Sequence, residues 1–151
     1  MIRRRTLLGG FALGLSVFLS SAGGARAEAP ARLGFSELYA SIGVLGLQFS
    51  DKVKGLAGKP VAIRGFMAPP LKPEADFFVL TREPVALCPF CQTDADWPAD
   101  IIMVYMQDGA RFTTNTDRIE VTGILEVGSK TDRKTGFVSL LRIVDGRWRK
   151  L

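Results

Sequence analysis

Two stretches of the sequence decide the fold: VAIRGFM at residues 61–67 and IEVTGILEV at residues 119–127. In both, every second residue is apolar or glycine, which is the pattern of a half-buried β-strand. Both also carry a glycine at the fifth position, Gly65 and Gly123, and a glycine inside a strand often marks a bulge or a tight bend. The two stretches therefore predict strands of a curved sheet.

Three further runs complete the β pattern. Residues 77–80 and 101–106 are continuously apolar, as expected for buried strands. A turn-rich segment at 128–136 joins the strand at 119–127 to residues 137–144 and predicts a hairpin. Five strands, dominated by short-range antiparallel connections, predict a mainly β fold, a small five-stranded antiparallel barrel of the oligonucleotide/oligosaccharide-binding type (OB-like). An open α+β sheet is the alternative.

The sequence predicts one or two short helices before these strands. Within residues 34–50, four apolar residues recur at helical spacing between an N-cap at Ser36 and a stop at Gly43; they are Phe35, Leu38, Tyr39 and Ile42. A second helix is predicted at residues 51–57, with Ser50 as its N-cap and Gly58 at its end.

The first 27 residues have the composition of an export signal. Three arginines at 3–5 precede an apolar stretch at 7–19, and Ala25-Arg26-Ala27 forms a cleavage site, so the mature chain would begin after Ala27. The apolar stretch is shorter than the ~20 residues of a spanning helix, which predicts a cleaved signal and no stable membrane anchor. Residues 4–8 (RRTLL) resemble the twin-arginine signature. An ordinary Sec signal beginning with three arginines is the alternative.

Charge and composition exclude several classes of function. The chain has 20 basic and 15 acidic residues, a formal charge of +5, but residues 1–27 hold four arginines and no acid. The mature chain is therefore close to neutral, which with export argues against a nucleic-acid partner. Histidine is absent, which excludes serine–histidine catalysis and histidine-ligated metals. Residues 28–33 are expected to be a flexible lead-in, residues 34–151 a single domain, and residues 147–150 a solvated or interacting tail.

The connection between the predicted strands at 77–80 and 101–106 holds both cysteines of the chain, Cys88 and Cys91. Asp94, Asp96 and Trp97 follow them in the same connection. Connections of this length within a compact domain are usually functional or disordered. We therefore expect the distinctive site of the protein here, with Asp94, Asp96 and Trp97 as ligand-facing residues.

Three chemistries are open for the Cys88-Pro89-Phe90-Cys91 pair. A structural disulfide would close a very short loop and stabilise the fold by about 2 kcal/mol, and the oxidising periplasm favours it. A redox dithiol would resemble the C-P-x-C centres of glutaredoxin-like proteins, but the βαβ setting of those centres is missing. A metal site would use both thiolates to bind a thiophilic ion, Zn or Cu.

A metal site here needs more ligands than the cysteine pair supplies. A closed zinc site has four ligands, so Asp94, Asp96 or a second chain would have to complete it. Soft sulfur donors favour Cu(I), which makes three methionines candidate ligands, although methionine in an apolar strand also serves as core filling; they are Met67, Met103 and Met106.

The stretch VAIRGFMAPP at 61–70, the phenylalanine-rich run at 77–80 and the cysteine-bearing connection resemble a family of exported bacterial proteins of unknown function. The resemblance extends from about residue 34 to residue 146 and includes Glu120–Gly123 as a Val-x-Gly strand. Many relatives have a single cysteine followed by a proline-rich stretch, whereas this chain has a pair. The resemblance implies an OB-like exported domain, in some cases associated with transporter components and with metal-linked roles, and no established activity.

These observations favour an exported periplasmic binding or accessory domain without enzymatic activity, whose distinctive site is the connection that carries Cys88 and Cys91. Its partner would be an envelope protein or a transporter component. The alternatives are a periplasmic thiol–disulfide oxidoreductase that uses the two cysteines, and a structural envelope module with a local disulfide.

Overall fold

The computed structural model describes residues 28–43, 46–70, 75–87, 93, 95, 97–109 and 112–151. The predicted export signal, residues 1–27, lies outside this part and stays a prediction. The described elements are, in chain order, β1 Ala31–Leu33, the 3-10 turn η1 Phe35–Glu37, β2 Tyr39–Gly43, β3 Gly46–Phe49, α1 Asp51–Leu56, β4 Pro60–Met67, β5 Phe77–Thr81, β6 Ile101–Met106, β7 Arg118–Thr131 and β8 Val138–Lys150. The protein is mainly β, as the sequence predicts.

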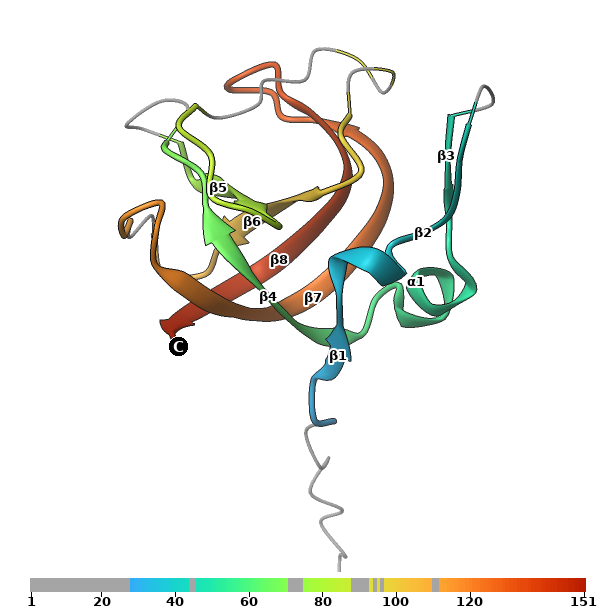
Figure 1. Ribbon diagram of the computed structural model, residues 1–151, viewed down its shortest axis with the longest axis horizontal. Coiled ribbons are helices and arrows are strands. Elements are labelled where there is room, and N and C mark those ends of the chain that lie inside the picture. Colours follow the sequence, from blue (N-terminus) through green and yellow to red (C-terminus); the bar gives the residue numbers. More distant parts are fainter. Residues whose placement is uncertain are drawn as a thin grey trace, which may run out of the picture.

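Within the described chain, six strands form one sheet whose pairing closes on itself (Figure 1). β4 pairs antiparallel with both β5 and β7, β5 pairs with β6, and β7 pairs with β8. β6 and β8 run parallel and close the ring, and β1 adds to β4 in parallel. The prediction of an antiparallel barrel is therefore wrong at the β6–β8 pair, and β1, which was not predicted as a strand, adds a second parallel pair. β8 reaches β6 only after the chain has passed through β7, and such a crossover permits parallel pairing.

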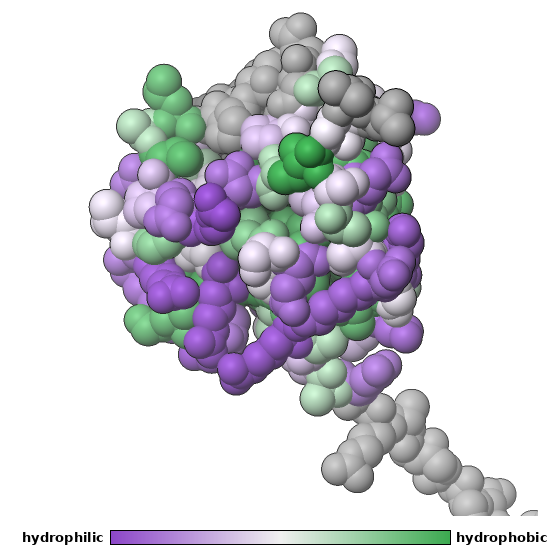
Figure 2. Space-filling view, turned by 45° about the vertical axis from the view of Figure 1, so that its right-hand side comes forward, coloured by the Kyte–Doolittle hydropathy of each residue, from purple (hydrophilic) through white to green (hydrophobic). Residues whose placement is uncertain are grey.

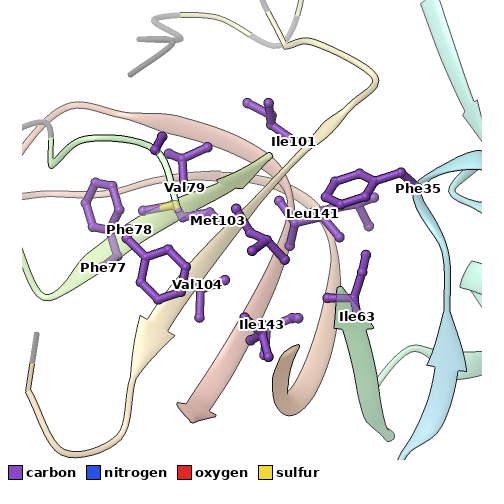
Figure 3. Packing of buried hydrophobic residues seen from close by; sticks show 14 of the residues in the cluster. Phe35, Ile63, Phe77, Phe78, Val79, Ile101, Met103, Val104, Leu141 and Ile143 are labelled. Atoms are coloured by element: carbon purple, nitrogen blue, oxygen red, sulfur yellow. The ribbon is translucent and has the colours of Figure 1, made fainter. Parts of the chain in front are cut away.

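The five strands that the sequence predicts are all present, because their burial follows the apolar pattern. Along β4 the residues at odd positions from Val61 to Met67 are buried, and Arg64 between them is exposed. Every residue of β5 is buried, as the continuous apolar run predicts. Figure 3 shows side chains from β4, β5, β6 and β8 gathered between the strands, with Phe35 of η1 at one side of the cluster.

Gly65 and Gly123 allow two close approaches of the sheet to itself. A Cβ added to Gly65 would lie 2.5 Å from the carbonyl oxygen of Thr81, and one added to Gly123 would lie 2.5 Å from Cγ2 of Ile143. The register between β7 and β8 also shifts at Gly123, between Thr122 and Ile124. The predicted irregularity is therefore present at Gly123, and at Gly65 the glycine is required because no side chain fits.

The helix predicted within residues 34–50 is wrong. Apart from the three-residue turn η1, this segment forms a separate hairpin of β2 and β3, which stands away from the six-stranded sheet in Figure 1. The apolar residues that fit a helical face have different environments in this hairpin. Leu38 is fully buried, the ring of Tyr39 stacks on Phe49 with centroids 5.6 Å apart, and Ile42 is 70% exposed. Gly46 has a φ of +83°, a left-handed conformation that suits a hairpin turn and not a helix.

The structure also tests the predictions for the short helix after Ser50, for the lead-in and for the C-terminal tail. The short helix after Ser50 is present as α1, and the Ser50 hydroxyl accepts a hydrogen bond from the backbone N–H of Val53 at 3.1 Å. Half of the expected flexible lead-in, residues 31–33, is instead strand β1. The expected tail at 147–150 is wrong, because these residues continue β8 and pair with β7. No helix in the described ranges is long and apolar enough to cross a membrane.

Candidate functional site

The connection between β5 and β6 leaves the sheet through a closed neck. Thr81 and Ile101, the last and first residues of these strands, are paired. Just beyond them, the backbone N–H of Arg82 donates to the carbonyl oxygen of Asp100 at 3.1 Å. The ends of the connection are thus held together, and connections of this length within a compact domain are usually functional or disordered.

Four of the predicted site residues, Cys88, Cys91, Asp94 and Asp96, lie outside the described residues. The disulfide, redox and metal interpretations of the cysteine pair therefore stay predictions. In the part of the chain that the structure does describe, no group of three or more cysteine, aspartate and glutamate side chains is arranged to hold a metal ion.

The arm of the connection that precedes the cysteines is held by residues from the segment between β6 and β7. The side-chain amide of Asn115 donates to the carbonyl oxygen of Val85 at 2.8 Å, and Val85 packs partly buried against the core. Two residues later, Leu87 is 83% exposed. The chain therefore turns outward from the core immediately before Cys88.

The arm that follows the cysteines is held by Trp97. Its side chain is only 5% exposed, its indole Nε1 donates to the hydroxyl of Tyr39 at 2.8 Å, and its ring meets Phe137 edge-on with centroids 6.3 Å apart. Burial raises the pKa of Tyr39 to about 12, so the phenol is neutral at physiological pH. Trp97 therefore anchors the connection to the β2–β3 hairpin and the core, and its expected contact with a ligand stays a prediction.

The three methionines considered as Cu(I) ligands occupy strands of the sheet. Met67 and Met103 are almost completely buried within the apolar cluster, and Met106 packs partly buried against it. Their position matches the core-filling role that methionine commonly has in a strand.

A groove of about 710 Å³ lies beside the neck and was not foreseen from the sequence. It is bounded by β1, η1, the outward face of β4, the start of β7 and the two residues after β5. Figure 2, which brings the side with the β2–β3 hairpin forward, shows hydrophilic side chains over much of the surface with apolar patches between them. Five basic side chains line the groove: Arg32, Lys52, Arg64, Arg82 and Arg118.

Two of these basic side chains are neutralised by acids of the same groove. Arg64 Nε lies 2.8 Å from Glu120 Oε2, and Lys52 Nζ lies 2.7 Å from Glu37 Oε1. The hydrogen bond from Arg64 holds the pKa of Glu120 below its ordinary value, and that from Lys52 does the same for Glu37. Both acids are therefore charged and already engaged at neutral pH.

A second hollow of about 320 Å³ continues the groove toward the hairpin. The two hollows share Phe35, Ser36 and Arg82, and the second is also lined by Tyr39, Ile42, Ala99 and Asp100. The neck of the cysteine-bearing connection, Arg82 with Asp100, therefore stands at the place where the hollows meet.

Sequence reasoning missed the groove because its basic residues belong to distant parts of the chain. Arg32 lies in the expected lead-in, Arg82 follows a strand and Arg118 begins one. Only the pairing of β1, β4 and β7 brings Arg32 and Arg118 to one face. The one signal available was the alternation of residues 61–67, which predicts that Arg64 points away from the core.

Comparison with known proteins adds information on the fold alone. No protein-family model matches the chain, and no curated protein is significantly similar to it. Among solved structures, the chain is similar to a DUF3299 family protein from Pseudomonas aeruginosa PAO1, with a TM-score of 0.55 and 15% sequence identity over 82% of this chain and 97% of that one. At this identity the similarity shows a shared fold, consistent with the expected resemblance to a family of unknown function.

Proposed function

We propose that the protein is an exported binding or accessory domain of the periplasm, without enzymatic activity, that uses the connection carrying Cys88 and Cys91 as its recognition surface. The observation that carries the proposal is the way this connection is held. Its neck is closed by Arg82 and Asp100, and its arms are fixed through Val85 and Trp97. A scaffold that fixes a long connection at both arms is typical of binding loops.

The scaffold of this site is proposed to be an OB-like barrel. Support comes from the pairing, in which five strands in the order β4, β5, β6, β8, β7 return to β4. OB folds are five-stranded Greek-key barrels that bind ligands through their loops and strand faces. The ligand of the cysteine pair is proposed to be a thiophilic metal ion, Zn or Cu, since thiolates prefer these ions.

Export and partner class rest on the sequence. The twin-arginine-like signal at 1–27 supports a periplasmic location with cleavage after Ala27, and the partner is proposed to be an envelope protein or a transporter component. The near-neutral mature chain supports a partner other than nucleic acid.

Native mass spectrometry of the protein isolated from the periplasm tests the proposal. We expect a bound zinc or copper ion under metal-replete conditions, its loss on chelation, and its absence from the double variant Cys88→Ser/Cys91→Ser. Asp108→Asn is the control, because it alters an exposed carboxylate outside the connection. A fully oxidised cysteine pair with no metal would overturn the metal assignment, and mixed disulfides trapped by Cys91→Ser would replace it with an oxidoreductase.

A further inference from the structure

Three arginines of the groove have no acidic partner among the described residues. Arg32, Arg82 and Arg118 are all exposed, and none of them forms an ion pair with another described side chain, whereas Arg64 and Lys52 in the same groove do. Glu83 is the one acid in the lining that is likewise unpaired within the described ranges. The groove thus presents more free positive than negative charge.

The register of the sheet spreads these arginines along the groove. Arg32 lies opposite Ala62 on one side of β4, and Arg118 lies opposite Phe66 on the other side. With strands ~4.8 Å apart and a rise of ~3.3 Å per residue, the two Cα atoms are about 16 Å apart. Arg82 follows Thr81, which pairs with Phe66 on the same edge of β4 as β1. The charges therefore border a strip, which suits an extended ligand better than a compact ion.

The lining indicates the chemistry of that ligand. Guanidinium groups bind carboxylates through two parallel hydrogen bonds. Phe35 and Phe66 provide apolar walls, and the strip continues to Ile42, which is 70% exposed on the hairpin. Glu83, the unpaired acid of the same lining, would repel a polymer with a charge on every unit, such as a nucleic acid or polyphosphate.

We propose that this groove docks an extended peptide segment of a partner protein in which acidic residues are spaced apart and accompanied by an apolar residue. The carboxylates pair with Arg32, Arg82 and Arg118, and the apolar side chain lies against Ile42. The interaction does not involve the cysteines, so an experiment can refute this proposal without refuting the proposed metal site, and the reverse.

Fluorescence anisotropy with a labelled peptide tests the docking. The probe has about eight residues, enough for an extended chain to span the groove at ~3.3 Å per residue, with three spaced glutamates and one leucine. We expect binding that weakens with salt and is lost when the glutamates are replaced by glutamine. Each of Arg32→Gln, Arg82→Gln and Arg118→Gln should weaken binding by roughly 5-fold, as for one partly solvated ion pair.

Arg133→Gln is the matched control. Arg133 is exposed in the turn between β7 and β8 and does not line the groove, so the same change of charge should leave the affinity unaltered. Ile42→Ser should weaken binding by roughly 3-fold through lost apolar contact. Circular dichroism melts of every variant check that the six-stranded sheet is folded in each comparison.

Several results would overturn the proposal. One is an affinity that is the same for the glutamate and glutamine peptides, or the same in the three arginine variants and in Arg133→Gln. Another is binding of oligothymidylate or polyphosphate as tight as that of the peptide and equally dependent on the three arginines, which would assign the groove to a polyanion. The Cys88→Ser/Cys91→Ser variant should bind the peptide as tightly as the unaltered protein. A loss of peptide affinity in this variant would show that the peptide binds at the cysteine site and not in the groove.

Discussion

The turn between β7 and β8 and the connection between β5 and β6 are held in opposite ways. In the turn, Asp132 organises its own neighbours: Oδ1 accepts hydrogen bonds from the backbone N–H of Lys134 at 3.1 Å and of Thr135 at 2.9 Å, and the Asp132 carbonyl accepts from Gly136 at 2.8 Å. In the connection, two described residues are held by bonds to other elements, Val85 by Asn115 and Trp97 by Tyr39.

This difference shows which loop depends on the rest of the molecule. The backbone of the β7–β8 turn is held by local bonds to Asp132, and Tyr105 of β6 adds one hydrogen bond from a distant strand. The position of the cysteine-bearing connection depends instead on the β2–β3 hairpin and on the segment before β7. The two loops meet where Trp97 packs edge-on against Phe137, which follows the turn. Trp97 is therefore the residue whose loss tests the comparison most directly.

The largest effect is expected from Trp97→Ala. Removing this buried indole takes away the contact with Phe137 and the hydrogen bond to Tyr39, and truncation of a large aromatic side chain in a core costs about 3–5 kcal/mol. Urea unfolding measures the loss. Trp97→Phe retains the apolar contact and should lose about 1 kcal/mol, the usual net value of one hydrogen bond. If Trp97→Ala cost less than Trp97→Phe, the anchoring role of the indole would be refuted.

Asp132→Ala is expected to have an intermediate effect and to act on the other loop. It removes the acceptor for the backbone and hydroxyl of Thr135, for Lys134 and for the hydroxyl of Tyr105. At about 0.5–1.5 kcal/mol for each net bond, reduced because the site is partly solvated, we expect a loss of about 2 kcal/mol.

Asp108→Ala is the control for that change, because Asp108 is exposed in another loop. Limited proteolysis then separates the two loops: the Asp132 variant should be cut more readily near residues 132–137 and no more readily in the cysteine-bearing connection. Equal sensitivity of both loops would show that they form a single unit.

The smallest effects are expected from pH. Stability should fall in acid through Asp132, which organises the β7–β8 turn, and in alkali through Tyr39, which holds Trp97 of the connection. Burial raises the pKa of Asp132, but hydrogen bonds from Thr135 more than offset it, so the pKa lies below its ordinary value of 3.8. The charged Asp132 therefore adds stability above that value, which is lost as the pH falls through the lowered pKa. The pKa of Tyr39 is raised by burial from 10.0 to about 12, so its contribution is complete below pH 10 and is lost as the pH rises through 12.

Melting temperatures measured across the pH range check both signs. The difference between the unaltered protein and Asp132→Asn should shrink in acid, and the difference from Tyr39→Phe should shrink in alkali. A Tyr39→Phe difference that shrank in acid instead would contradict the assignment of Tyr39 as the neutral acceptor for Trp97.

Local pattern was enough to predict most of the sheet. Each of the five predicted strands is present because its alternation or continuous apolar run matches the burial that pairing imposes, as in β4 and β5. A glycine inside an alternating strand also predicts the irregularity at Gly123, and the structure shows that a Cβ there would lie 2.5 Å from Cγ2 of Ile143. These features depend on residues close together in the chain.

Predictions that depend on distant partners failed or were not made. The spacing of Leu38 and Ile42 fits a helix, but Tyr39 is held by Phe49 and Trp97, and this favours a hairpin. The parallel pairing of β6 with β8 has no local signature. The groove has no local signature either, because Arg32 and Arg118 are brought to one face of the sheet only by the pairing of β1 and β7 with β4.

The closure of the ring has a consequence for how the chain folds. β4 meets its main partner, β7, through contacts such as Arg64 with Glu120, which are 56 residues apart in the sequence. Before β7 is available, β4 can pair only with three residues of β1 and two of β5. Pairing over such separations must overcome a large loss of chain entropy and is slow, on a scale of milliseconds to seconds. The protein therefore reaches its native sheet only after almost the whole chain has been synthesised, and the long edge of β4 stays open until then.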